Sequence, residues 1–288
     1  MIRDFATASS PELRSRVEAH LASPGRQPVG LRPASTVMLV RDGSTGIEVF
    51  MLQRVATMEF APSTMVFPGG GVDGRDHADQ LPWAGPDSLE WALRLGSDKA
   101  GARMLVVAAV REVFEECGVL LASVSPGGPL FDVSGESWQA ARQGLVAREL
   151  SLCELLIERG LVLRSDLLRA HAHWVTPEFH SKRYDTRFFV ARMPPAQTAD
   201  DKSTEADVAG WFAPADVLAA YEAGEAILLP PTVVCLQDLA RFSTAAACFA
   251  HTPVIRTVEP TLQTLEDGSV VVRVDLNGRP QEHYLDDD

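Results

Sequence analysis

The hydrophobic residues between positions 102 and 117 recur with the period of an α-helix. At about 100° per residue, four apolar residues share one side of that helix: Val110, Val113, Phe114 and Cys117. Three glutamates fall on the other side: Glu112, Glu115 and Glu116. The pattern therefore predicts a helix with one face in the core and one acidic face.

Similar patterns predict the elements before and after this helix. Alternating and apolar runs predict strands at residues 34–41, 47–54, 120–124, 183–193 and 209–212. Helical spacing predicts helices at residues 11–21, 87–95, 216–223 and 232–242, and a longer helical segment over 136–172. A turn at residues 265–270, flanked by apolar residues, predicts a β-hairpin. Strands and helices are thus mixed along the whole chain.

The clustering of like charges on the acidic helix has two explanations. A solvated surface helix is the simpler one, but such helices usually mix charges to form i,i+4 pairs. Three neighbouring carboxylates repel each other unless a cation lies among them, and carboxylate oxygens suit magnesium or manganese. From the pattern alone, a metal site and a plain acidic surface both stay open.

A glycine-rich segment precedes the acidic helix. Residues 67–73 combine an apolar approach, a proline that fixes φ, and three consecutive glycines: Gly69, Gly70 and Gly71. Glycine lets the backbone approach a ligand closely, although a lone glycine run is more often a plain turn. Followed by the acidic helix, the segment becomes one half of a candidate site.

Together the two segments resemble the signature of the Nudix hydrolases. That pattern runs Gly, five residues, Glu, seven residues, then Arg-Glu-apolar-x-Glu-Glu-x-Gly-apolar, and residues 111–119 match its second half at every fixed position. The first half matches when Gly70 is the glycine and Asp76 stands where the family has its first Glu. This alignment implies an insertion at residues 77–103, which we expect to influence substrate choice.

Landmarks beyond the signature are similar to those of the peroxisomal coenzyme A diphosphatase branch of the superfamily. They lie at residues 174–177, 183–189, 208–211 and 229–232. The resemblance implies an α+β fold, a Nudix-type α/β/α sandwich with a mixed sheet, enlarged by helical insertions. We expect an N-terminal helix and linker over residues 1–33, a Nudix domain over 34–243 with insertions at about 77–103 and 125–172, and a C-terminal extension with the hairpin over 244–288.

The resemblance also implies a reaction. This is the magnesium-dependent hydrolysis of the diphosphate bond in a nucleoside diphosphate linked to another group, with coenzyme A or acyl-coenzyme A as the first candidates. A pyrophosphatase for ADP-ribose or a dinucleotide such as NADH is the alternative, as is a Nudix-fold protein that binds a nucleotide without cleaving it. Family members are often dimers, so a homodimer is a further expectation.

Roles for individual residues follow from the resemblance. It implies magnesium or manganese ligands at Glu112, Glu115, Glu116 and the carbonyl of Gly70. Arg111 is expected to orient Glu112 through a bidentate contact, which suits the arginine fork. The general base is either Glu112 or an acidic residue from a distant loop, where Glu205 is the candidate.

Four residues form the candidate substrate-binding set: Arg54, Gly69, Gly71 and Arg183. Arg54 follows a strand and precedes the glycines, so it could reach a substrate phosphate, although a surface position is equally open. Arg183 shares one face of an alternating strand with Arg187 and Asp185, where the alternative is a structural ion pair.

Composition and charge indicate which kinds of molecule the protein can bind. The 288 residues carry a formal net charge of -13, which argues against nucleic acid, whose phosphates need a basic face. No apolar run approaches the roughly 18 residues of a membrane span.

The four cysteines form no CxxC pair, which indicates a reducing compartment. The chain ends in three aspartates rather than a Ser-Lys-Leu address, so we expect a soluble, cytoplasmic protein that acts on a small diphosphate substrate.

Overall fold

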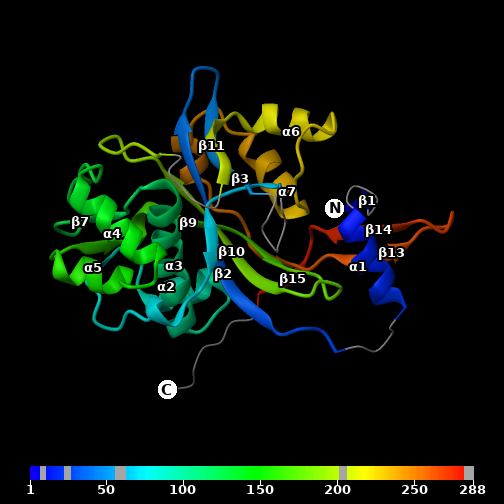
Figure 1. Ribbon diagram of the computed structural model, residues 1–288, viewed down its shortest axis with the longest axis horizontal. Helices are drawn as coiled ribbons and strands as arrows, with labels where there is room; N and C mark the ends of the chain where they lie inside the picture. Colours follow the sequence, from blue (N-terminus) through cyan, green and yellow to red (C-terminus); the bar gives the residue numbers. More distant parts are fainter. Residues whose placement is uncertain (7–10, 23–26, 56–62, 201–205, 282–288) are drawn as a thin grey trace.

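The computed structural model describes residues 1–6, 11–22, 27–55, 63–200 and 206–281, and places a mixed sheet between helices (Figure 1). The main strands follow the order β11 (Ala206–Phe212), β3 (Ile47–Arg54), β2 (Leu31–Asp42), β10 (Arg183–Arg192), β9 (Leu168–Val175), β12 (Arg256–Val258) and β15 (Arg279–Pro280). Two short strands, β4 (Met65–Val66) and β5 (Gly69–Gly71), pair with β3 and β2. Strand β10 pairs in parallel with β2 and antiparallel with β9, so the sheet is mixed as predicted.

Strand β2 shows why the sheet is covered on both faces. Val37 and Leu39 join a core with α2 (Ser88–Leu95) and α3 (Lys99–Cys117). Met38 and Val40 join a second core with α7 (Pro230–Leu239) and α8 (Ala245–Ala250). Successive side chains of a strand point to opposite faces, and all four of these are fully buried. The predicted α/β/α sandwich is therefore confirmed.

Most predicted helices are present. Helix α3 begins at Lys99, where the Asp98 side chain accepts a hydrogen bond from the N–H of Gly101, and it ends before Gly118, whose φ is 70°. Helices α1 (Pro11–Leu21), α2, α6 (Pro214–Glu222) and α7 lie where the periodicity predicted them. Among the described residues, no helix is both long and apolar enough to cross a lipid bilayer.

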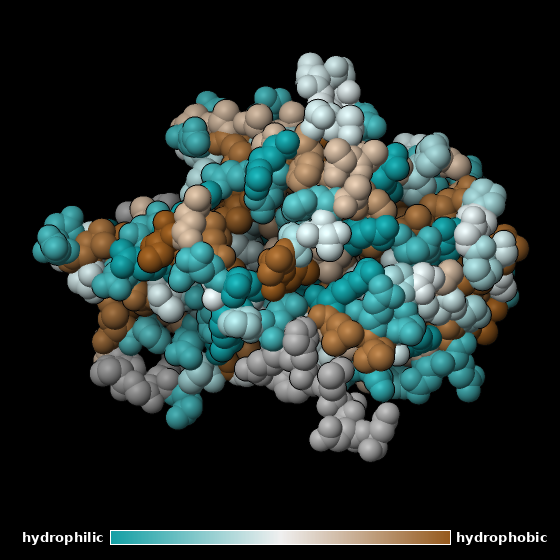
Figure 2. Space-filling view, turned by 180° about the vertical axis from the view of Figure 1, so that it is seen from behind, coloured by the Kyte–Doolittle hydropathy of each residue, from teal (hydrophilic) through white to brown (hydrophobic). Residues whose placement is uncertain are grey.

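The face of the molecule seen in Figure 2 mixes hydrophilic and hydrophobic residues.

The helical prediction over residues 136–172 is right only in its first part. Helices α4 (Glu136–Val146) and α5 (Leu152–Glu158) are followed by strands β8 (Val162–Arg164) and β9. Gly160 has a φ of 63°, in the left-handed region that readily ends a helix. Pairing with β10 then holds β9 extended, which is a tertiary effect that local spacing did not reveal. The strand expected at 120–124 is reduced to β7 (Ala122–Ser123), which pairs with β8 beside β6 (Trp83–Ala84).

The two terminal segments meet in space. Strand β1 (Ile2–Ala6), which the sequence did not predict, pairs antiparallel with β14 (Val270–Asp275). Strand β14 also pairs with β13 (Thr261–Thr264), which confirms the predicted hairpin. Figure 1 shows this small sheet beside α1, at one side of the central sheet. The domain limits at 34 and 243 stay a prediction.

The segment 77–103 belongs to the core. Trp91 of α2 is fully buried, and its ring centroid lies 5.8 Å from that of Phe189 on β10. Arg187 donates hydrogen bonds to the carbonyls of Leu95 and Gly96 at the end of α2. No residue of the segment lines the main cavity. The structure thus places this insertion in the core, and its expected influence on substrate choice stays a prediction.

Candidate functional site

The two halves of the signature meet beside α3. Arg111 is 5% exposed, and its guanidinium donates to both carboxylate oxygens of Asp76, over 2.8 Å from Nε and 3.0 Å from Nη2. It also donates to Glu112 over 2.6 Å and to the Gly71 carbonyl over 2.9 Å. Asp76, which the alignment puts where the family has its first Glu, lies 35 positions earlier in the chain and yet contacts Arg111.

A local turn positions Asp76. The Asp73 side chain accepts a hydrogen bond from the N–H of Arg75, and Asp76 accepts one from the N–H of Asp73 over 2.8 Å. This reciprocal capping box fixes a carboxylate that is only 1% exposed. The bidentate contact that we expected between Arg111 and Glu112 forms with Asp76 instead. Adjacent residues of a helix do not face each other, so the fork of Arg111 can align with a partner outside the helix.

The three glutamates of α3 line one cavity, where two of them share Arg111 as a partner and the third contacts the glycine segment. Glu112 contacts Arg111, and Glu115 Oε2 lies 3.3 Å from Nη1 of the same arginine. The other oxygen of Glu115 is buried and has no hydrogen-bond partner. Glu116 accepts a hydrogen bond from the N–H of Gly69 over 2.8 Å. Across the ranges that the structure describes, no three metal-binding side chains converge on one point.

The net negative charge of the side chains around Arg111 nevertheless suits a bound cation. One buried guanidinium faces three carboxylates, those of Asp76, Glu112 and Glu115. Burial, opposed by Arg111 and reinforced by Glu115, raises the pKa of Glu112 to about 7, and burial also raises the pKa of Glu115. A divalent ion would neutralise the excess charge and give the unpartnered Glu115 oxygen a ligand contact. The donor set is therefore suited to a hard metal ion.

The glycine segment brings the backbone against these side chains. Strand β5 pairs with β2, and a Cβ atom on Gly70 would lie 2.4 Å from a carboxylate oxygen of Glu112. The absence of a side chain is thus what allows this approach. The N–H of Gly69 and the carbonyl of Gly71, which we expected to face a substrate, hold two side chains of α3.

The remaining candidates differ in their surroundings. Arg54 lines the cavity, and its Nε is buried without a hydrogen-bond partner. Arg183 is buried outside the cavity lining and donates to Glu259 over 2.6 Å and to the Thr176 carbonyl over 2.9 Å, which are the surroundings of a structural ion pair. Glu205 lies outside the described residues.

Sequence reasoning missed Arg142 of α4. This buried side chain donates to the Glu115 carbonyl over 2.8 Å and to Asp200 over 2.7 Å. Carbonyls at the C-terminal end of a helix carry partial negative charge, so the guanidinium stabilises the turn that carries Glu115 and Glu116. The only signal in the sequence was the position of Arg142 within the helical pattern of α4. That position does not distinguish a buried arginine from an exposed one.

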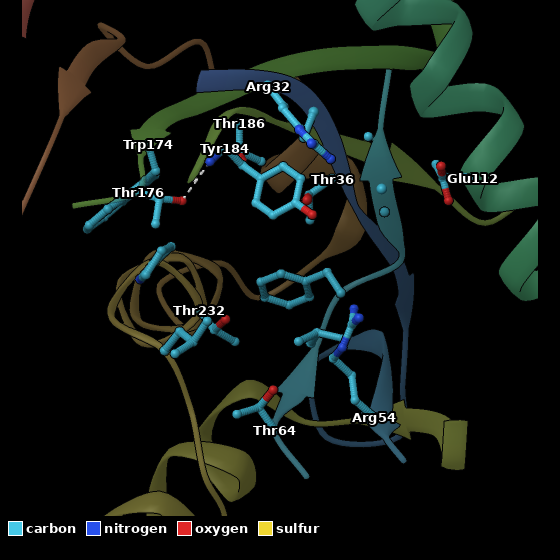
Figure 3. A pocket seen from close by; sticks show the side chains of 18 of the residues that line it. Arg32, Thr36, Arg54, Thr64, Glu112, Trp174, Thr176, Tyr184, Thr186 and Thr232 are labelled. Atoms are coloured by element: carbon cyan, nitrogen blue, oxygen red, sulfur yellow. Dashed lines mark hydrogen bonds between the residues drawn. The ribbon is translucent and has the colours of Figure 1, made fainter. Parts of the chain in front are cut away.

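The cavity has a volume of about 1410 Å³ and extends well beyond the acidic cluster. Figure 3 shows Glu112 on one side and, around the rest of the cavity, residues from β2, β3, β9, β10, α7 and the loop after β9: Arg32, Thr36, Arg54, Trp174, Thr176, Tyr184, Thr186 and Thr232. A space of this size, with arginines and aromatic rings in its wall, can hold an extended anionic ligand.

This chain is similar to known proteins in sequence and in fold. The family model of the NUDT19 Nudix domain matches residues 94–241. Acyl-coenzyme A diphosphatase NUDT19 of Gallus gallus is 29% identical over 246 residues, which cover 70% of this chain and 63% of that protein. The Homo sapiens protein of the same name is 30% identical over 240 residues, which cover 69% and 62%. The matched region thus spans less than two thirds of these two relatives.

A solved structure extends the comparison to three dimensions. The crystal structure of a NUDIX hydrolase from Alicyclobacillus acidocaldarius is 28% identical to this chain, with a TM-score of 0.61. The match covers 78% of this chain and 97% of that chain.

Proposed function

This chain belongs to the NUDT19 Nudix domain family, and from that premise we propose that it hydrolyses the diphosphate bond of coenzyme A or an acyl-coenzyme A with a bound magnesium ion. The observation that carries the proposal is the buried contact of Arg111 with Asp76, because it joins both halves of the signature beside a large cavity. Relatives named acyl-coenzyme A diphosphatase support this substrate class.

Each group in the site has a defined part in this reaction. Glu112, Glu115 and Glu116 would hold the metal, together with the carbonyl of Gly70. When bound, the ion neutralises charge on the phosphoryl oxygens and lowers the pKa of water. Among the described residues, Glu112 is the candidate group to accept the proton of the attacking water. Arg54 would bind a phosphate oxygen through its unpartnered Nε.

Mass spectrometry of the products tests this proposal. Water adds to one phosphorus, the bridging P–O–P bond breaks, and coenzyme A yields 4'-phosphopantetheine and 3',5'-ADP. We would incubate the protein and magnesium with coenzyme A, acetyl-coenzyme A, ADP-ribose and NADH. Cleavage of only ADP-ribose or NADH would keep the hydrolase and reject the coenzyme A assignment. Cleavage of none would favour a protein that binds nucleotides without hydrolysis.

Gly70→Ala is expected to lower kcat roughly 100-fold. The new methyl group would displace the Glu112 carboxylate, and a shift of about 1 Å in a catalytic group has an effect of this size. Gly135→Ala is the matched control, because a Cβ atom there meets nothing within 4 Å and the residue does not line the cavity. Steady-state kinetics of both variants test the effect, and equal activities would contradict the assigned role of Gly70.

Magnesium is expected to raise the Tm of the wild-type protein by roughly 5 °C at a hundredfold excess over its Kd. Glu115→Gln should lose most of this rise, because it removes the charge of the carboxylate that carries the unpartnered buried oxygen. Without metal its Tm should equal or exceed that of the wild type, since one of three clustered carboxylates is neutralised. Differential scanning calorimetry, with EDTA as reference, checks both statements. An unchanged magnesium shift in the variant would exclude Glu115 as a ligand.

A further inference from the structure

The charges around the cavity are distributed unevenly. Its carboxylates belong to α3 and to the neighbouring turn at Asp73. Three cavity arginines have no carboxylate partner among the described residues: Arg16, Arg32 and Arg54. Arg32 is exposed and the other two are half-buried, so in a chain with a net charge of -13 these arginines offer positive charge to an anionic ligand in the cavity. Arg54 is already assigned to the substrate, whereas Arg16 and Arg32 have no role in the proposed chemistry.

Arg32 lies on a wall formed by β2 and β10. Its register partner on β10 is Tyr184, and Figure 3 shows both side chains directed into the cavity, apart from Glu112. The N–H of Tyr184 donates to Thr176 Oγ1 over 3.0 Å, which joins the end of β9 to the same wall. An arginine and an aromatic ring therefore stand side by side at this end of the cavity.

Residues of the terminal segments line the same cavity. Nη1 of Arg16, on α1, lies 3.4 Å from Nδ1 of His180, in the loop between β9 and β10. Burial and the nearby Arg16 lower the pKa of His180 to about 4, so the imidazole is neutral near pH 7 and leaves the arginine charge available for a ligand. Phe5 of β1 and Val272 of β14 line the cavity as well.

We propose that Arg32 and Tyr184 of this wall, with Arg16 of the same cavity, bind the nucleoside end of the substrate through a phosphomonoester, apart from the diphosphate beside α3. The inference rests on the proposed function, because it assigns one end of the same substrate. Coenzyme A carries such a group, the 3'-phosphate of its adenosine. Guanidinium groups bind phosphate through charge-assisted hydrogen bonds, and an aromatic ring can stack on the base.

Kinetics with coenzyme A and dephospho-coenzyme A, which lacks the 3'-phosphate, test the assignment. The wild type should prefer coenzyme A in kcat/KM by roughly tenfold or more, the effect of a hydrogen bond between charged groups. Arg32→Ala and Arg16→Ala should each lose roughly tenfold on coenzyme A and less than about threefold on dephospho-coenzyme A. Arg14→Ala, an exposed arginine of α1 that pairs with Glu18, should change neither value. Equal losses on both substrates, or a wild type without preference, would overturn the proposal.

Binding without turnover separates this inference from the proposed function. Isothermal titration calorimetry would compare 3',5'-ADP with 5'-AMP. If the wild type cleaves neither coenzyme, the proposed function fails, while a preference for 3',5'-ADP that Arg32→Ala removes would still support the phosphomonoester subsite. Equal affinities for the two nucleotides would overturn the subsite whether or not coenzyme A is hydrolysed.

Discussion

Replacing Glu116 by Gln is expected to lower the turnover of coenzyme A by roughly two to four orders of magnitude while the fold stays intact. The glutamine keeps the size of the side chain, and its oxygen can still accept the hydrogen bond from the N–H of Gly69. What is lost is the negative charge, and with it a proposed ligand of the metal. Steady-state kinetics over a range of magnesium concentrations would measure the effect.

A second glutamate serves as the matched control for this variant. Glu158 is exposed at the end of α5 and does not line the cavity, so Glu158→Gln should retain wild-type turnover. Circular dichroism and Tm would show that both variants are folded. If Glu116→Gln folds and turns over coenzyme A within about threefold of the wild type, the assignment of Glu116 to the metal site is wrong.

Asp76→Asn is expected to lower the free energy of unfolding by about 3 kcal/mol, because it leaves the buried Arg111 without its bidentate charged partner. The amide of the asparagine would also direct an N–H group toward the guanidinium, where only an acceptor fits. Glu112 and Glu115 still contact Arg111, which keeps the loss at the lower end of the range for a broken buried pair. Urea denaturation measures the change.

Two further sets of variants provide the control for Asp76→Asn and a test of the coupling between Asp76 and Arg111. Asp79 is exposed near His77, so Asp79→Asn should change stability by less than about 0.5 kcal/mol. A double-mutant cycle of Asp76→Asn with Arg111→Met would isolate the interaction. A coupling energy below about 0.5 kcal/mol would show that this contact does not join the two halves of the site.

The structure explains why the insertion inside the signature is tolerated. Between Asp76 and Arg111 the chain leaves the site, forms α2 against the core, and returns as the first turns of α3. The capping box at Asp73 and the fork of Arg111 then restore the contact. The signature therefore depends on the two ends that meet in space and not on the length of chain that separates them.

The local elements of the site could be predicted from the sequence. The acidic face of α3 depends on contacts within a few residues, which the helical period records directly, and the hairpin at residues 265–270 depends on local turn chemistry in the same way. The second half of the signature added the candidate metal ligands, because its residues are consecutive. Local order in the chain was sufficient for these features.

Long-range packing decided the rest. An alignment could only suggest Asp76, and the fold is what places its carboxylate beside Arg111. Arg183 is the opposite case, because its contact with Glu259 makes a candidate substrate ligand part of the scaffold. The pairing of β1 with β14 and the presence of Arg16 and Arg32 in the lining of one cavity also join distant segments. Sequence spacing records which residues are neighbours along the chain. Burial and pairing between elements determine which of them share a site, and those depend on the whole structure.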